Sequence, residues 1–392
     1  MSPNSSKKNL SKHTDGKDEY FIARALNLAK KGQGLTSPNP AVGAVVVKNG
    51  IIVGEGFHEK AGQPHAEVIA LNNAGKDAEG ATIYVTLEPC SHFGKTPPCV
   101  HKIKESGIKR VVSAIKDPNP LVSGKGLEYL INNGIEVKDG VLSKEANRIN
   151  EIFFKYITTG MPFITVKEAV TLDGNLGYKT DAEKVYLSSP KSLEYTHYTR
   201  FINDAVMISA KTLIKDDSSL DVRINKSNMK EKFLKKRWTK IVLDSYLNTS
   251  PSSKIFESHG DVLIFASNDY DKAKVERKKH LEEKGAIITD VYYNIKEGKK
   301  LLNLEYVFKK CGELKITGIL VEAGPELFSS LIKERFCDKI IFNFTPYFLG
   351  RKNGLDLFGR LNLEFKEKIN FSGLSIKKIK DDAFLSYYPE FT

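Results

Sequence analysis

The sequence predicts an α/β protein of two domains. Its 392 residues exceed the size of one ordinary hydrophobic core. Apolar, strand-like runs alternate with helical patterns in both halves, and a Gly-Met-Pro break at 160–162 separates the halves. With 41% hydrophobic and 28% charged residues, the composition is that of a globular protein. We expect a disordered tail at 1–18, a first domain at 19–148 and a second domain at 149–392.

In the first half, short strands are predicted to alternate with helices. Apolar side chains within 19–32 recur on one helical face, which predicts a helix there. Asn49-Gly50, a favoured two-residue hairpin turn, joins two apolar runs. The predicted order is helix 19–32, strands 41–48 and 51–58, helix 65–74, strands 81–87 and 110–117, helix 126–133, strand 134–140 and helix 143–158.

The second half repeats runs that are typical of buried strands. The lysine-rich stretches 225–237 and 268–300 are weakly patterned, so we expect surface loops and helices there. Alternating strands and helices predict a sheet whose ligands bind near the carboxyl ends of its strands. The strand-like runs are 163–174, 204–210, 240–245, 261–267, 318–324 and 339–350.

Charge and hydropathy narrow the function classes. The net charge of +12 raises the possibility of nucleic-acid binding. However, the lysines are spread along the chain, and no RNA-stacking or helix-turn-helix signature accompanies them. Solvated surfaces and an anionic small-molecule substrate explain the charge, so nucleic acid is not the expected partner.

The sequence also argues against membrane insertion and export. No apolar run approaches the roughly 20 residues that cross a bilayer. The first twenty residues lack the apolar segment of a secretory signal. We therefore expect a cytoplasmic protein, in which Cys311 and Cys337 are reduced and buried.

A pattern of one histidine and two cysteines predicts a catalytic zinc site. His65, Cys90 and Cys99 supply an imidazole and two thiolates, which fill three corners of a tetrahedron and leave the fourth open. Glu67 lies two residues after the histidine and is placed to shuttle protons rather than to bind metal. Zinc lowers the pKa of a bound water from about 15.7 to about 7. This chemistry suits hydrolytic removal of an amino group from a ring carbon.

The alternative is a structural zinc site with a fourth protein ligand. His92 or His101 would then supply it. Structural sites usually have closely spaced pairs of ligands, whereas His65 lies far from the two cysteines in sequence. The acidic residue beside the histidine also favours the catalytic interpretation.

These motifs resemble the bifunctional deaminase–reductase family of riboflavin biosynthesis. The resemblance covers about 19–392 and is close in the first half, in SPNPAVGAVVV, PHAEVIAL, YVTLEPCSHFGKTPPC and DPNPLVSGKGL. Nucleic-acid and nucleoside deaminases have two residues between the cysteines of this motif, whereas eight separate Cys90 from Cys99 here. The longer loop favours the riboflavin branch.

The resemblance implies a cytidine-deaminase-like, three-layer first domain. His65, Cys90 and Cys99 would bind zinc, and Glu67 would be the catalytic residue. The implied substrate is 2,5-diamino-6-ribosylamino-4(3H)-pyrimidinone 5′-phosphate, which loses a ring amino group. Asn39 would contact the pyrimidine, although simple turn geometry between two prolines explains it equally well.

The second half resembles the family's NADPH-dependent reductase, whose fold is similar to dihydrofolate reductase. The matching phrases are KEAVTLDG, HYTR, SAKTLIKDDSSLDVR, IVLDS and VEAGPELFSSLI. The strand-to-helix turn in the last phrase would bind cofactor phosphate through backbone N–H groups. An ordinary strand-to-helix turn would have the same sequence pattern. The implied cofactor-binding residues are Ala169, Tyr186, Thr212, Asp216, Ser245, Gly324, Pro325, Glu326, Leu327, Phe328, Ser329 and Ser330.

The implied substrate-binding residues of this half are Lys184, Arg200, Leu220, Arg223 and Glu322. The guanidinium groups of Arg200 and Arg223 could clamp the substrate phosphate, or each could form a surface salt bridge instead.

The second half departs from the family pattern at 175–186. Asn175 replaces an arginine, Tyr186 stands where tryptophan is expected, and Lys184 falls near a common serine. Two alternatives therefore stay open. The second domain could be a non-catalytic relative of the reductase, or the chain could be an RNA-editing deaminase with a basic RNA-binding domain. The resemblance also implies a homo-oligomer.

Overall fold

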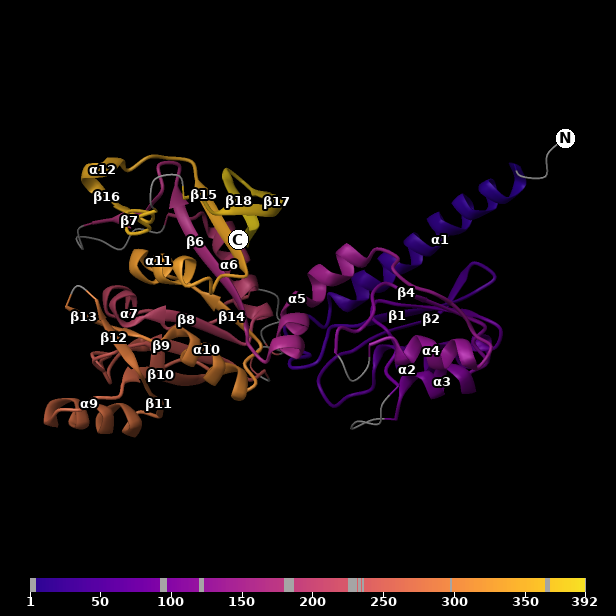
Figure 1. Ribbon diagram of the computed structural model, residues 1–392, viewed down its shortest axis with the longest axis horizontal. Coiled ribbons are helices and arrows are strands. Elements are labelled where there is room, and N and C mark those ends of the chain that lie inside the picture. Colours follow the sequence, from indigo (N-terminus) through magenta and orange to yellow (C-terminus); the bar gives the residue numbers. More distant parts are fainter. Residues whose placement is uncertain are drawn as a thin grey trace. The chain divides into compact units, whose positions relative to one another are not determined.

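The structure is a computed structural model. It describes residues 5–391 except 92–96, 120–122, 180–186, 225–230, 232–233, 235, 297 and 364–366, and only the backbone of 5–15. The chain forms two compact units, Met1–Gly160 and Met161–Thr392 (Figure 1). Both contain a sheet with helices, which confirms the α/β class. The division falls at Gly160, later than the expected boundary, because the last helix of the first unit runs to Thr159.

The first unit is built on a five-stranded sheet of order β2-β1-β3-β4-β5. Strands β1 and β2 form the hairpin predicted at Asn49-Gly50, both of which have positive φ. Strands β3, β4 and β5 are parallel to one another. The elements are α1 (Ser5–Ala29), β1 (Gly43–Lys48), β2 (Ile51–Phe57), α2 (Ala66–Ala74), the 3-10 helix η1 (Gly75–Ala78), β3 (Thr82–Val85), α3 (Cys99–Glu105), β4 (Arg110–Ser113), α4 (Lys125–Asn132), β5 (Glu136–Lys138) and α5 (Ser143–Thr159).

Helices cover both faces of this sheet, as the three-layer prediction requires. Alternate strand residues point to opposite faces. Val46 and Ile83 pack in the cluster that includes residues of α2, α3 and α4. Val45 and Val112 pack in the cluster that includes residues of α1 and α5.

Glycines let the helices approach the hairpin closely. A Cβ at Gly43 would lie 2.1 Å from the Ala25 carbonyl oxygen of α1. A Cβ at Gly56 would lie 2.5 Å from the Ala66 carbonyl oxygen of α2. A side chain at Gly43 would push α1 outward, and one at Gly56 would push α2 outward. Gly56 therefore seats α2, which begins beside His65.

Helix α1 extends into the segment that we expected to be a disordered tail. It begins at Ser5, and Asp18 within it is only 1% exposed. The Asp18 carboxylate accepts hydrogen bonds from Arg110 (2.8 and 3.0 Å), Lys138 (2.9 Å) and Tyr84 (3.1 Å). These partners lie at least 66 residues away in sequence, so no local pattern reveals that Asp18 is buried.

The second unit contains a nine-stranded sheet of order β11-β10-β9-β8-β14-β6-β15-β18-β17. Strands from β11 to β15 are parallel, and the β17–β18 hairpin continues the sheet antiparallel. The strands are β6 (Phe163–Thr171), β7 (Asn175–Tyr178), β8 (Ala205–Ser209), β9 (Thr239–Leu243), β10 (Asp261–Ser267), β11 (Ala286–Val291), β12 (Tyr293–Lys296), β13 (Lys299–Leu302), β14 (Gly318–Val321), β15 (Lys339–Thr345), β16 (Gly354–Asp356), β17 (Asn370–Ile379) and β18 (Asp382–Glu390). The helices are α6 (Pro190–Ile202), α7 (Ala210–Asp216), η2 (Lys254–Phe256), α9 (Lys272–Glu283), α10 (Leu304–Glu313), α11 (Pro325–Lys333) and α12 (Gly350–Asn353).

All six strand-like runs of this half are strands of the large sheet. Their core includes Val166 of β6 and Met207 of β8, packed with Phe308 of α10 and Phe328 of α11. The expected loops and helices at 268–300 are only partly correct, because β11, β12 and β13 lie there beside α9. These strands and β17 expose many residues, so they lack the continuous apolar run of a buried strand.

Candidate functional site

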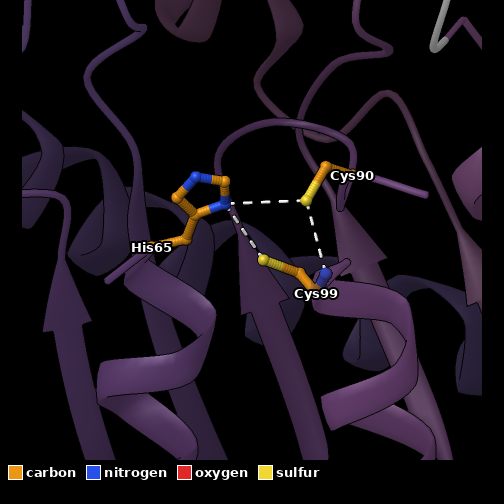
Figure 2. Close-up of side chains that lie close together, drawn as sticks. All are labelled: His65, Cys90 and Cys99. Atoms are coloured by element: carbon orange, nitrogen blue, oxygen red, sulfur yellow. Dashed lines mark hydrogen bonds between the residues drawn. The ribbon is translucent and has the colours of Figure 1, made fainter. Parts of the chain in front are cut away.

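Three elements of the first unit bring His65, Cys90 and Cys99 together (Figure 2). His65 is the N-cap residue of α2, and Cys99 is the first residue of α3. Cys90 follows β3 by way of Glu88-Pro89. The expected metal ligands, 34 residues apart at the extremes, therefore meet at the starts of two helices.

The geometry of this group suits a tetrahedral metal. His65 Nδ1 lies 3.2 Å from Cys99 Sγ and 3.6 Å from Cys90 Sγ. Zinc bonds of about 2.3 Å to sulfur and about 2.05 Å to nitrogen give a tetrahedral S···N edge of about 3.6 Å. The backbone N–H of Cys99 also donates to Cys90 Sγ at 3.3 Å, which stabilises a thiolate there. The donor set therefore fits zinc.

The group is also electrostatically prepared to bind a cation. A hydrogen bond with the Cys99 thiol, helped by the His65 imidazole, lowers the pKa of Cys90 to about 4. The same hydrogen bond and burial raise the pKa of Cys99. A thiolate is thus present at neutral pH, and zinc would displace the remaining thiol proton.

Glu67 lies in the first turn of α2 and is 3% exposed. Among the described residues, it does not belong to the group of ligand atoms that could hold a metal. Burial raises the pKa of its carboxyl group above the ordinary value. A buried carboxyl beside a metal site, but outside the ligand set, has the properties of a proton shuttle.

The histidines considered as a fourth ligand do not complete the group in the described part of the chain. The His101 ring hydrogen-bonds the Tyr129 hydroxyl at 3.0 Å and packs edge-on against its ring. His92 lies outside the described residues. The described ligands therefore number three, as an open catalytic site requires.

A histidine that the sequence analysis did not single out orients Asn39. His58 is 2% exposed, and its Nδ1 lies 3.1 Å from the Pro64 carbonyl oxygen. Since a carbonyl only accepts, Nδ1 carries the proton and Nε2 is an acceptor. The Asn39 Nδ2 group, 3.2 Å from Nε2, must donate to it, which leaves the Asn39 oxygen for another partner. His58 lies in GFHEKAG, just before the PHAEVIAL phrase that contains His65, and this position was the available signal.

Glu88, also not predicted, supports the loop beside the metal group. Its buried carboxylate accepts hydrogen bonds from the backbone N–H groups of Asp117 (3.2 Å), Gly124 (2.9 Å) and Gly126 (2.9 Å). The Glu-Pro-Cys turn is thereby tied to the start of α4. The Glu88 side chain therefore fixes the loop that carries Cys90 and does not belong to the ligand group of the described residues.

The second unit has a cavity of 1920 Å³, located where β6, β8, β9 and β14 end. Such a position at the carboxyl ends of parallel strands is the one that the sequence predicted. The cavity is lined by thirteen of the predicted residues, namely Ala169, Arg200, Thr212, Asp216, Leu220, Arg223, Ser245, Glu322, Gly324, Pro325, Glu326, Leu327 and Ser330.

Four predicted residues of this half are not placed in the cavity. Phe328 is 2% exposed and belongs to the hydrophobic core. The Ser329 hydroxyl donates to the Arg360 carbonyl oxygen at 2.5 Å. Helical rotation turns both away from the cavity that Glu326, Leu327 and Ser330 line. The remaining two, Lys184 and Tyr186, lie outside the described residues.

The guanidinium nitrogens of Arg200 already make hydrogen bonds within the protein. Its Nε and one terminal nitrogen bind both oxygens of Glu322 at 2.7 Å, and its other terminal nitrogen donates to the Asp221 carbonyl at 2.8 Å. Of the two alternatives for Arg200, the structure shows an ion pair, in which Arg200 orients Glu322 and also holds the loop at Asp221. Arg223 is exposed and lines the cavity, so it is the better candidate for the phosphate.

Lys167 is a cavity residue that the sequence analysis missed. It lies on β6, is 7% exposed, and has Glu322, Glu168 and Arg200 as charged neighbours. Burial lowers the pKa of its ammonium group. A lysine and a glutamate side by side within a buried strand, in FITVKEAVT, were the signal that could have identified it.

Two helix starts converge on the same cavity and fit a dinucleotide. Ser209 caps α7 by accepting from Thr212 N at 3.3 Å, and its hydroxyl bonds the Thr212 hydroxyl at 3.0 Å. A Cβ at Gly324, where α11 begins, would lie 3.4 Å from Thr212 Oγ1. The backbone N–H groups of a helix start favour phosphate. The residues present therefore fit the pyrophosphate of a nicotinamide cofactor.

Comparisons with known protein families agree with both sites. Residues 15–115 match the family model for the cytidine and deoxycytidylate deaminase zinc-binding region. Residues 162–385 match the model for the RibD C-terminal domain. The first range contains the whole metal group, and the second contains the whole cavity.

Individual relatives extend over most of the chain. A riboflavin biosynthesis protein RibD of Aquifex aeolicus is 44% identical over 352 residues, which covers 90% of this chain and 93% of that protein. A diaminohydroxyphosphoribosylamino-pyrimidine deaminase of Buchnera aphidicola is 56% identical over 146 residues, covering 37% of this chain and 99% of that protein.

A solved structure also superimposes on the chain. It is a diaminohydroxyphosphoribosylaminopyrimidine deaminase/5-amino-6-(5-phosphoribosylamino)uracil reductase of Thermotoga maritima. Its TM-score is 0.78 at 33% sequence identity, with 96% of this chain and 100% of that chain covered.

Proposed function

The chain belongs to the RibD family of bifunctional riboflavin biosynthesis enzymes, and from this premise we propose how its two units divide the chemistry. The first unit is a zinc-dependent deaminase and the second an NADPH-dependent reductase. The substrate of the first is 2,5-diamino-6-ribosylamino-4(3H)-pyrimidinone 5′-phosphate. The second reduces the ribosyl group of the deaminated product to a ribityl chain.

The observation that carries the deaminase assignment is the three-ligand group with a buried carboxyl group beside it. A zinc ion in this group supplies a Lewis acid that lowers the pKa of a coordinated water to about 7. Glu67 would accept a proton from the attacking water and deliver it to the amino group, which leaves as ammonia. The Asn39 amide, oriented by His58, contacts the pyrimidine through its oxygen.

In the reductase, charged residues at the cavity floor act on the ribose. Bound NADPH supplies a hydride for reduction at the sugar carbon that is attached to nitrogen. Lys167 donates a proton from its ammonium group to the ribose ring oxygen as the ring opens, because burial lowers the pKa of that group and makes it a stronger acid than an exposed lysine. Arg200 holds Glu322 in place for this step, and Arg223 binds the substrate phosphate.

A coupled assay tests the function. Zinc-loaded protein is incubated with the diaminopyrimidine phosphate, with NADPH present or withheld. We expect ammonia release in both cases and NADPH oxidation only with substrate present. Without ammonia release the deaminase assignment fails. Ammonia release without NADPH binding or oxidation would leave a deaminase that carries an inactive second unit.

Arg200→Ala separates the two activities. It removes the partner of Glu322 in the second unit, so NADPH oxidation should fall by at least tenfold, the effect of losing about 1.4 kcal/mol of transition-state stabilisation. Ammonia release should be unchanged, because no deaminase residue is altered. A parallel loss of both activities would contradict this division.

We also propose that the enzyme is a cytoplasmic homo-oligomer that acts on small molecules and not on nucleic acid. None of the helices in the described part of the chain is long and apolar enough to span a membrane. The four cysteines are free thiols, which supports a reducing compartment. Light scattering tests the oligomer, and a steep salt dependence of tRNA binding would contradict the exclusion of nucleic acid.

A further inference from the structure

Four charged side chains meet at the mouth of the second unit's cavity. Glu326, in the first turn of α11, lies 2.8 Å from Lys299 of β13. Lys211 of α7 and Arg360, in the turn after β16, each lie 3.7 Å from the same Glu326 oxygen. All four line the cavity, and the side chains of Lys211, Lys299 and Arg360 are 80%, 51% and 51% exposed. Three cations thus share the one carboxylate of Glu326.

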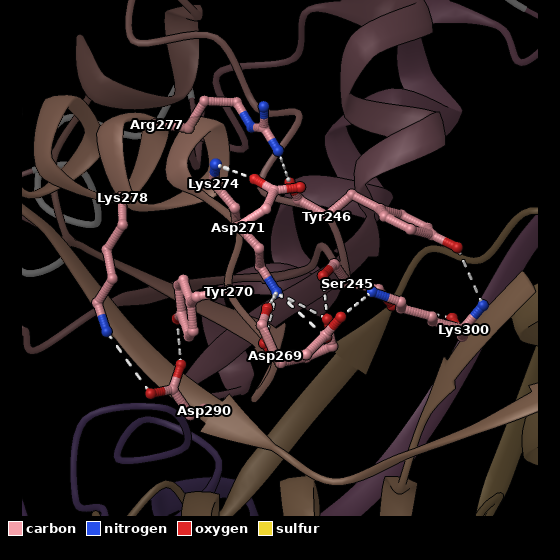
Figure 3. A network of polar contacts seen from close by, with 11 residues as sticks. Ser245, Tyr246, Asp269, Tyr270, Asp271, Lys274, Arg277, Lys278, Asp290 and Lys300 are labelled. Atoms are coloured by element: carbon pink, nitrogen blue, oxygen red, sulfur yellow. Dashed lines mark hydrogen bonds and ion pairs between the residues drawn. The ribbon is translucent and has the colours of Figure 1, made fainter.

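The neighbouring lysine on β13 has a different role. Lys300 forms an ion pair with Asp269 and lies over the ring of Tyr246 (Figure 3). It also lies over the ring of Tyr293. The Ser245 hydroxyl donates to the Lys300 carbonyl at 3.0 Å. Successive strand residues point to opposite faces. Both lysines line the cavity, but Lys300 holds the Ser245–Tyr246 turn, whereas Lys299 pairs with Glu326.

The charge of the group distinguishes between the phosphates of a dinucleotide. The pyrophosphate, which NADH and NADPH share, is a diester that the backbone N–H groups at the start of α11 can bind. A phosphate monoester carries about −1.5 to −2 charges at pH 7 and favours several cations. The 2′-phosphate of NADPH is such a monoester, and NADH lacks it. Its charge suits a group of three cations gathered around one carboxylate.

We propose that Lys211, Lys299 and Arg360 bind the 2′-phosphate of NADPH and thereby make the reductase select NADPH over NADH. This inference rests on the proposed reductase function and adds the residues that choose the cofactor. Glu326 holds the three side chains together before the cofactor arrives. When the 2′-phosphate enters, these cations exchange the carboxylate for phosphate oxygens.

The test measures binding of the adenosine end of the cofactor alone. The full chain is titrated calorimetrically with 2′,5′-ADP and with 5′-AMP, neither of which carries the pyrophosphate bridge or nicotinamide. Lys211→Met and Lys299→Met should each weaken 2′,5′-ADP binding about tenfold, as expected for loss of one charge-assisted contact, and leave 5′-AMP binding unchanged. The kcat/KM ratio of NADPH to NADH should fall by the same factor.

Lys310→Met is the matched control. Lys310 is an exposed lysine of α10, paired with Glu313 at 3.1 Å, and it does not line the cavity. It removes the same charge from the same unit, so it should leave the binding of both probes unchanged. An equal loss with this control would reduce the effect to net charge and overturn the proposal.

Glu326→Gln gives the opposite result. Without the competing carboxylate, 2′,5′-ADP should bind more tightly, whereas a purely structural role for Glu326 would give weaker binding. Equal weakening of both probes by the lysine variants would assign these residues to the adenosine 5′-phosphate instead and would overturn the proposal. If wild-type protein binds neither probe nor NADPH, the reductase function itself fails, which is a separate outcome.

Discussion

At the scale of a residue, the buried position of the Glu67 carboxyl group beside the metal ligands supports its role as a proton shuttle. It lies two residues after a ligand, is 3% exposed, and stands outside the ligand group of the described residues. Glu67→Gln keeps the shape and removes the acid. Ammonia release should fall by about 10²–10⁴-fold, the usual range for a general acid–base. Bound zinc, measured by metal analysis, should stay at the wild-type ratio.

Cys99→Ser is the comparison for this variant. It removes a ligand, so it should lose zinc and lower the melting temperature of the first unit. Cys337→Ala, which alters a buried thiol of the second unit, should retain zinc. Zinc loss in Glu67→Gln would make Glu67 a ligand and would contradict its role as a proton shuttle.

At the scale of elements, the loop that follows α7 is held in place by hydrogen bonds from Trp238 and from the loop that contains Ser258. Leu220 in this loop adopts a positive φ of 50°, and its carbonyl accepts from Trp238 Nε1 at 3.3 Å. The Ser258 hydroxyl donates to the Ser219 carbonyl at 2.7 Å. Lys240, fully buried on β9, in turn donates to the carbonyls of Ile255 (2.5 Å) and Ser258 (2.8 Å). A buried ammonium group therefore supports a loop that lines the cavity.

Lys240→Met should impair the reductase reaction, although Lys240 is not among the residues that line the cavity. Leaving two carbonyls without their charged donor costs about 1–3 kcal/mol, measurable by urea unfolding of the second unit. The KM of the reductase for its pyrimidine substrate should rise several-fold, and ammonia release should be unchanged. Ser258→Ala, which removes the link to Ser219 and one hydrogen bond from Lys240 but keeps both carbonyl contacts of Lys240, should shift KM in the same direction by less. A destabilised variant with an unchanged KM would contradict a positioning role.

At the scale of the whole molecule, acid should weaken the second unit through a buried histidine. Burial, together with Arg200 and Arg223, lowers the pKa of His197 to about 4. In the unfolded chain the pKa of histidine is about 6.5. Above pH 6.5 both states are neutral, and between pH 6.5 and 4 the unfolded state binds the proton first. Stability is therefore lost as pH falls through this window, by roughly 3 kcal/mol in total.

Urea unfolding of the second unit at pH 7 and at pH 4.5 measures this loss. Comparison with His197→Gln isolates the histidine from the carboxyl groups that titrate in the same range. The variant should lose less stability between the two pH values than the wild type does. Equal losses would show that His197 does not govern the acid sensitivity.

The sequence by itself determined the class of both units and the reaction of the first. The metal group could be predicted because its chemistry is local: a histidine and a glutamate in one helical turn, and two cysteines joined by a short loop. The six buried strands of the second unit could be predicted because each carries its own apolar run. These are properties of short segments, which periodicity and spacing express directly.

Only the tertiary structure decided which polar groups face one another. The Arg200–Glu322 pair joins residues 122 positions apart, so the sequence left a phosphate clamp and a salt bridge as equal alternatives for Arg200. Asp18 was placed in a disordered tail because its partners lie on three distant strands. Lys211, Lys299 and Arg360 come from separate elements and meet only at Glu326. Charges on separate elements become one site when folding brings them within about 4 Å, a distance that a linear pattern does not contain.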